Sequence, residues 1–217
     1  MKNEQARFNM IEQQIRPWNV LDKGVLELLT IVKREKFLPE KQKSLAFMDT
    51  ELPLADGSLS LTPKIEAHIV QDVAIKKHES ALVVGSGTGY LPALLAFHAR
   101  HVTCVENSPA IFSAAQQALH REGVANVSIV QGDASKGWSD GAPYDVIVIT
   151  GSLQILPEEF KQQLKPGGRM FVILGSAPVM TAYLITKLSE SAFDTKPLFD
   201  TSVSAIANAD AVSAFTF

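Results

Sequence analysis

The chain has few of the residues that build disulfide frameworks, nucleic-acid surfaces or membrane spans. Its one cysteine, Cys104, allows no disulfide within the chain and lies in an apolar stretch, where a small buried side chain is expected. The formal net charge of −3, from 20 basic and 23 acidic residues, provides no basic field, so we expect no nucleic-acid partner. No apolar run reaches the length of a membrane span and the start lacks a leader-like apolar segment, which predicts a cytoplasmic protein without a membrane partner.

Apolar residues, in contrast, are plentiful. They make up 46% of 217 residues, enough for one substantial core, and no internal repeat or low-complexity tract divides the chain. We therefore predict a single domain over residues 1–217. Residues 1–79 would supply helices and a lid loop, and residues 80–217 a Rossmann-like core.

The apolar periodicity changes from helical to mixed near residue 80. From there strands and helices alternate, which predicts an α/β fold: a Rossmann-like, doubly wound, mostly parallel seven-stranded sheet with helices on both faces and an N-terminal helical extension. Helices are expected at residues 4–16, 22–35, 63–77, 90–99, 109–122 and 157–164, with Asp22, Thr62 and Ser108 as N-caps. Strands are expected at residues 80–84, 101–105, 127–131, 144–150, 169–174, 180–188 and 198–207, and the order of the last two stays open.

Three alternate glycines, Gly85, Gly87 and Gly89, follow the first strand of this core. Glycines at such a turn let backbone N–H groups approach a nucleotide-like ligand. The third glycine of a dinucleotide fingerprint would fall on Tyr90, and Gly89 is not followed by the Lys-Ser/Thr of a phosphate-binding loop, so NAD and ATP are disfavoured. The spacing Gly-x-Gly-x-Gly is common among S-adenosylmethionine enzymes.

Acidic residues end the next two strands. Glu106 is placed to accept both hydroxyls of a ribose, and Asp133 can accept a hydrogen bond from an adenine amino group. Together with the glycines they predict an S-adenosyl-L-methionine site at the carboxyl edge of the sheet. The expected cofactor-binding residues are Gly85, Ser86, Gly87, Gly89, Tyr90, Glu106, Asn107, Asp133, Ala134 and Thr150. The histidines are scattered, so no metal is expected.

Besides the glycine turn and the two acidic residues, further short motifs are distributed over nearly the whole chain. They are Glu12-Gln13-Gln14-Ile15, Phe37-Leu38-Pro39, Asp49, Leu52-Pro53, Gly132-Asp133, Gly137-Trp138, Ala142-Pro143-Tyr144-Asp145 and Gln163-Leu164-Lys165-Pro166-Gly167-Gly168. With the glycine motif they resemble the protein-L-isoaspartate O-methyltransferase family. The resemblance implies a class I S-adenosylmethionine-dependent fold and methyl transfer to the isoaspartate carboxylate of a damaged protein or peptide. It leaves the oligomeric state open.

Three positions depart from the family's pattern. Leu61 stands in the place of the family's active-site serine, Val83 in that of an acid, and Leu91 in that of a glutamine. The resemblance thus implies that three polar groups near the transferring methyl are apolar here. Candidate catalytic residues for the acceptor side are Ser60, Thr62 and Asp49, although Thr62 can also be a simple helix cap.

The acceptor therefore stays open at the level of the sequence. A carboxylate that attacks a sulfonium methyl needs positioning rather than a strong base. Apolar replacements remove hydrogen bonds that would hold a charged acceptor, so weak transfer to isoaspartyl peptides is expected. The alternatives are a different small or protein acceptor, and a catalytically silent module that binds S-adenosylmethionine.

Overall fold

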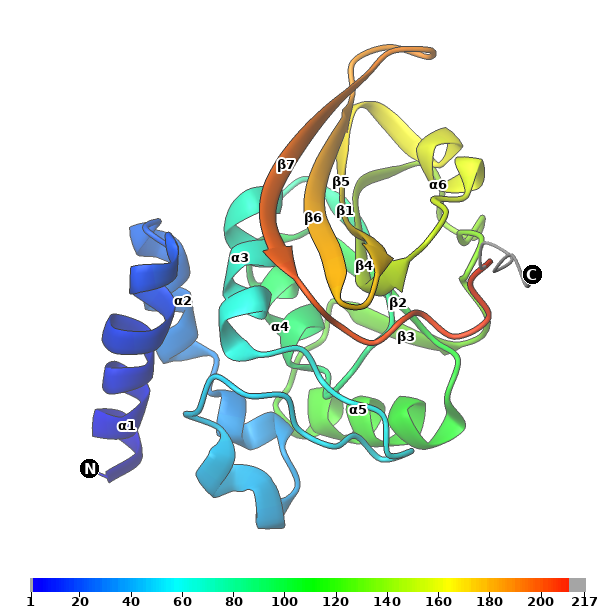
Figure 1. Cartoon of the computed structure of the whole chain (residues 1–217). Coiled ribbons are helices and arrows are strands. Elements are labelled where there is room, and N and C mark those ends of the chain that lie inside the picture. Colours follow the sequence, from blue (N-terminus) through cyan, green and yellow to red (C-terminus); the bar gives the residue numbers. More distant parts are fainter. Residues whose placement is uncertain (1, 211–217) are drawn as a thin grey trace, which may run out of the picture.

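The structure is a computed structural model that describes residues 2–210, so residue 1 and residues 211–217 of the expected domain lie outside it. Its centre is one seven-stranded sheet (Figure 1). The strands are β1 (Ser80–Val84), β2 (His101–Glu106), β3 (Val127–Gln131), β4 (Tyr144–Leu153), β5 (Leu164–Ser176), β6 (Val179–Lys187) and β7 (Phe193–Thr201). They lie in the order β3-β2-β1-β4-β5-β6-β7, the first five parallel and the last two antiparallel to their neighbours. The predicted fold class is confirmed.

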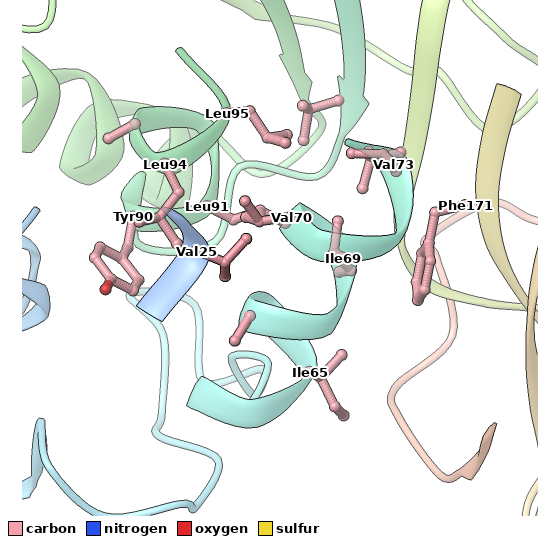
Figure 2. Packing of buried hydrophobic residues seen from close by; sticks show 14 of the residues in the cluster. Val25, Ile65, Ile69, Val70, Val73, Tyr90, Leu91, Leu94, Leu95 and Phe171 are labelled. Atoms are coloured by element: carbon pink, nitrogen blue, oxygen red, sulfur yellow. The ribbon is translucent and has the colours of Figure 1, made fainter. Parts of the chain in front are cut away.

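Alternate residues of β1 face two different layers of core, as the pleat of a strand requires. Ala81 and Val83 pack on the face that carries the helices α3 (Pro63–Val73), α4 (Tyr90–His98) and α5 (Pro109–Arg121). Leu82 and Val84 pack on the opposite face, which is covered by α6 (Glu158–Gln162) and the loop 132–143. Figure 2 shows the first layer, with Val70 of α3 beside Leu91 of α4.

The N-terminal extension packs outside α3 (Figure 1). It begins with α1 (Lys2–Met10), which continues as a π-helix at Ile11–Ile15 and a 3-10 turn at Arg16–Trp18, so the expected regular helix over 4–16 is only partly correct. After it come α2 (Lys23–Ile31) and 3-10 turns at Arg34–Phe37 and Glu40–Leu45. The side chain of Gln71 on α3 ties this extension to the core, since it accepts from the N–H groups of Leu21 and Asp22.

Two of the three expected N-caps are confirmed. Asp22 accepts a hydrogen bond from the N–H of Val25, and Ser108 accepts one from the N–H of Ile111. The cap expected from Thr62 is wrong, because its side chain makes no capping bond to α3. The start of α3 is instead satisfied by Asp49, whose Oδ1 accepts from the N–H of Lys64 at 3.1 Å.

The expected last strand at 198–207 is also wrong in its limits. Its pairing with β6 runs from Lys187↔Phe193 to Met180↔Thr201, so the length of β6 fixes the end of β7. The following residues 202–210, here called the C-terminal strap, leave this pairing and run beside the carboxyl end of β4 (Figure 1). Ser152 of β4 donates its N–H to the carbonyl of Ser204 and accepts from the N–H of Ile206.

Two expectations from composition concern burial and membranes. Cys104 is fully buried in β2, as expected, and burial raises the pKa of its thiol. Between residues 2 and 210 no helix combines the length and apolar character needed to cross a membrane. The cytoplasmic location stays a prediction.

Candidate cofactor and acceptor site

A pocket lies at the carboxyl ends of β1, β2 and β4, between the glycine turn and two other segments. One is the hairpin formed by residues 51–61, here called the acceptor hairpin, and the other is the C-terminal strap. The pocket brings together seven of the predicted site residues: Ser60, Gly85, Ser86, Gly87, Glu106, Asn107 and Thr150. Carboxyl edges of parallel sheets are where such folds bind ligands.

The glycines of the turn differ in what they permit. Gly85 has a φ of +88°, and a Cβ there would lie 2.3 Å from Oγ1 of Thr150. That threonine hydroxyl donates to the carbonyl of Val84, so it fixes the turn to β4. Gly87 has a φ of +53°, and apart from its chain neighbours no atom of residues 2–210 lies within 4 Å of a Cβ position there, which leaves its backbone open to a ligand.

Glu106 is held in the pocket by three hydrogen bonds. Its side chain is buried, Oε2 accepts from the N–H and hydroxyl of Ser86 at 2.7 and 2.9 Å, and Oε1 accepts from the N–H of Ser108 at 3.0 Å. A carboxylate has about four acceptor positions, so one or more remain for ribose hydroxyls. These residues fit an adenosine-containing cofactor.

Asp133 and Ala134 border a smaller adjoining recess that shares Gly85, Glu106 and Asn107 with the main pocket. The N–H of Ser135 donates to Oδ1 of Asp133 and, with burial acting against it, lowers the pKa of this carboxyl. Its Oδ2 accepts from the side-chain amide of Asn208 in the strap, at 2.9 Å. Asn208 is a donor of the same chemistry as an adenine amino group, so Asp133 is suited to the predicted contact.

Four predicted site residues do not line either cavity. Tyr90 is buried in the core, with its ring 5.5 Å from that of Phe37. Gly89 lies at the start of α4 behind the turn. The hydroxyl of Thr62 is buried without a hydrogen-bond partner among residues 2–210. The Asp49 carboxylate accepts from the backbone N–H of Lys64 and forms an ion pair with the Lys64 ammonium group at 3.0 Å. Their predicted roles in binding or catalysis stay predictions.

The three apolar departures occupy two different environments. Leu61 and Leu91 line the pocket. Val83, in contrast, is fully buried in the sheet between Cys104 and Val148 and does not line it. Of the three departures, Leu61 and Leu91 therefore add apolar surface to the pocket, and Val83 does not.

A further pocket residue, Glu66 of α3, was not among the sequence candidates. It is 5% exposed, and its Oε2 lies 3.3 Å from Nε of Arg34. Burial raises the pKa of Glu66 to about 7, although Arg34 acts in the opposite direction. The sequence does indicate that Glu66 is buried, because it lies four residues before Val70 and seven before Val73, on the apolar face of the helix.

This fold, with a glycine turn and a buried acid at the carboxyl edge of the sheet, defines a class I methyltransferase-type α/β protein. A model of the protein-L-isoaspartate(D-aspartate) O-methyltransferase family matches residues 5–206. The chain belongs to this family, whose members are S-adenosylmethionine-dependent methyltransferases. The resemblance identified from the sequence is thereby confirmed.

Individual relatives agree with this family. A protein-L-isoaspartate O-methyltransferase 1 of Rhodopseudomonas palustris (strain HaA2) is 37% identical over 188 residues, which cover 87% of this chain and 76% of the relative. A protein-L-isoaspartate O-methyltransferase of Brucella anthropi is 34% identical over 200 residues, covering 91% and 92%.

Solved structures agree as well. A protein-L-isoaspartate O-methyltransferase matches with a TM-score of 0.79 at 26% identity, over 94% of this chain and 65% of that one. A Plasmodium falciparum structure in complex with S-adenosyl-L-homocysteine also has a TM-score of 0.79, at 19% identity over 94% and 97%, which is a likeness of fold alone.

Proposed function

We propose that this protein methylates the isoaspartyl carboxylate of damaged proteins or peptides, with S-adenosyl-L-methionine as the methyl donor. The observation that carries the proposal is the pocket itself. In it the glycine turn and Glu106 adjoin the acceptor hairpin, within a chain that matches the family over residues 5–206. Family membership supports the acceptor, and the pocket supports the cofactor.

The proposed division of labour follows from the contacts. Glu106 would hold the ribose hydroxyls, the open backbone at Gly87 would face the ligand, and Asp133 would bind the adenine amino group. When bound, S-adenosylmethionine supplies an electrophilic methyl group on a positively charged sulfur. The acceptor carboxylate is already ionised at pH 7, so the protein has to orient it and exclude water rather than remove a proton.

Ser60 is suited to orienting the acceptor hairpin. Its hydroxyl accepts from the N–H of Leu52 at 3.1 Å and donates to the carbonyl of Leu61 at 3.0 Å, so its one proton is already used. We assign it the positioning of Leu61 and of the segment that precedes α3. Thr62 and Asp49 would act through the same segment, because Thr62 directly precedes α3 and the Asp49 side chain binds the first turn of that helix.

One observation favours a second candidate function. Leu61 and Leu91 give the acceptor side of the pocket an apolar surface, where a less polar acceptor than isoaspartate would fit. The chain would then be a methyltransferase of the same fold with a different acceptor.

The test uses the purified chain, methyl-labelled S-adenosylmethionine and a pair of peptides that differ only in an isoaspartyl or aspartyl residue. We expect label to enter the isoaspartyl peptide alone, as a base-labile ester. Binding of S-adenosylhomocysteine without transfer to either peptide would contradict the isoaspartyl assignment and leave two alternatives, a different acceptor and a catalytically silent module that binds S-adenosylmethionine. Absence of both binding and transfer would contradict the assignment of the cofactor as well.

A further inference from the structure

We propose that Glu66, in its protonated form, recognises the acceptor: its carboxylic acid donates a hydrogen bond to the acceptor carboxylate, in place of the hydroxyl that Leu61 lacks. This inference rests on the proposed function, because it assumes an anionic acceptor. It assigns Glu66 a role in binding and orientation, with no covalent step and no proton passed to the substrate.

The contacts of Glu66 leave one oxygen available to the pocket. Glu66 lines the pocket, and among residues 2–210 the one hydrogen bond to its side chain runs from Nε of Arg34 to Oε2 at 3.3 Å, which leaves Oε1 for a ligand. Arg34 also donates to the carbonyl of Leu61 at 3.5 Å and to that of Ala46 at 3.2 Å. One buried guanidinium therefore fixes both the Glu66 carboxyl and the backbone of the residue in the family serine's place.

The charges around the pocket explain why this carboxyl must be neutral. Within the described part of the chain the lining contains four carboxyl side chains and no Lys, Arg or His. The four are Glu51, Asp56, Glu66 and Glu106. An ionised Glu66 would therefore add repulsion to a site that has to accept an anion, while a protonated Glu66 removes one charge and offers a donor.

The other groups packed around Glu66 do not supply a free cation. Arg34 is buried behind it and bound as described, and Arg7 is paired with Glu35. The phenol of Tyr90 on α4 is a further titratable neighbour, and burial raises its pKa far above neutrality, so it stays uncharged. Among residues 2–210, an acceptor carboxylate in this pocket thus meets no positive group that is available to pair with it.

Burial raises the pKa of Glu66 to about 7, so this carboxyl gains or loses its proton near neutral pH. Below pH 7 the acid is mostly protonated and ready to bind the acceptor. Above pH 7 it is mostly ionised, so binding of a carboxylate must first take up a proton from solvent. Bound acceptor keeps the acid protonated, which confines the pH effect to KM.

The first experiment measures methyl transfer to the isoaspartyl peptide from pH 6 to 9. We expect kcat/KM to fall about tenfold per pH unit well above pH 7, through a rise in KM at nearly constant kcat. Glu66→Gln keeps the shape and a permanent donor, so its profile should be flat. Glu51→Gln removes a charge from the same pocket but should keep the inflection near pH 7. A flat wild-type profile, or an unchanged inflection in Glu66→Gln, overturns the inference.

A second measurement needs only the wild-type chain, in case Glu66→Gln does not fold. The isoaspartyl peptide is titrated calorimetrically into the complex with S-adenosylhomocysteine at pH 8, in two buffers of different ionisation enthalpy. Uptake of about one proton per peptide supports the inference, and uptake of none overturns it. No methyl transfer at any pH, with S-adenosylhomocysteine bound, would instead overturn the proposed function.

Discussion

The carboxylate of Glu106 serves two purposes at once, because it holds the glycine turn and faces the pocket. Its bonds to Ser86 and Ser108 fix the turn and the start of α5, and its remaining lone pairs are available to a ribose. We expect Glu106→Ala to weaken binding of S-adenosylhomocysteine by roughly 1.5–3 kcal/mol, the contribution of one charge-assisted hydrogen bond to the ribose. Isothermal titration calorimetry measures the loss.

Ser86→Ala is the matched control for this change. It removes the hydroxyl that donates to Glu106 but leaves the backbone N–H bond and the carboxylate in place. Its loss of affinity should therefore be about 1 kcal/mol or less. Undiminished affinity in Glu106→Ala would contradict the assignment of the ribose to this residue.

Leu61 and Val83 allow the apolar departures to be tested one at a time. Leu61→Ser places a hydroxyl in the pocket and should raise kcat/KM for the isoaspartyl peptide, whereas Val83→Glu places a carboxyl in the sheet core and should cost several kcal/mol of stability. Steady-state kinetics and urea unfolding separate the two effects. A Leu61→Ser variant with lower kcat/KM but wild-type stability would show that the leucine itself contributes to acceptor binding.

The acceptor hairpin borders the pocket and is held together by hydrogen bonds between its own two arms. Residues 51–61 are joined by a bridge between Pro53 and Leu59 and by the bond from the N–H of Leu54 to the carbonyl of Ser58, while Ser60 is buried at the base. Limited proteolysis should cut the exposed tip at 55–58 in the free protein, and S-adenosylhomocysteine should suppress this cut. Equal cleavage with and without ligand would contradict a role for the hairpin in covering the site.

The first turn of α3 depends on Asp49, which lies 15 residues away in the sequence. Asp49→Ala removes the cap and the ion pair with Lys64 and should lower the free energy of unfolding by about 1–2 kcal/mol. Asp49→Asn keeps an oxygen for the cap and should lose less than 1 kcal/mol, with kcat within about twofold of the wild type. A large loss of kcat in Asp49→Asn, at nearly normal stability, would show that Asp49 is catalytic.

At the scale of the whole molecule, the sequence predicts those parts whose signals are local. The strands at 80–84 and 127–131 are apolar runs bounded by turn residues, and their limits are confirmed. The limits of β7 were missed because this strand is an exposed, polar edge whose length depends on pairing with β6. Glu66 was missed because its burial depends on Arg34, 32 residues away.

The free energy of unfolding of the whole chain should depend on pH through the ionisation of Glu66. An acid whose pKa is raised on folding, here from 4.5 to about 7, binds more protons in the folded than in the unfolded state between these values. The free energy of unfolding therefore falls as pH rises through this window, by up to about 3 kcal/mol from this group alone. Urea unfolding at pH 5, 6, 7 and 8 should show this fall in the wild type and in Glu51→Gln, but not in Glu66→Gln. Parallel curves for all three proteins would mean that Glu66 is ionised in the folded state throughout, held so by Arg34.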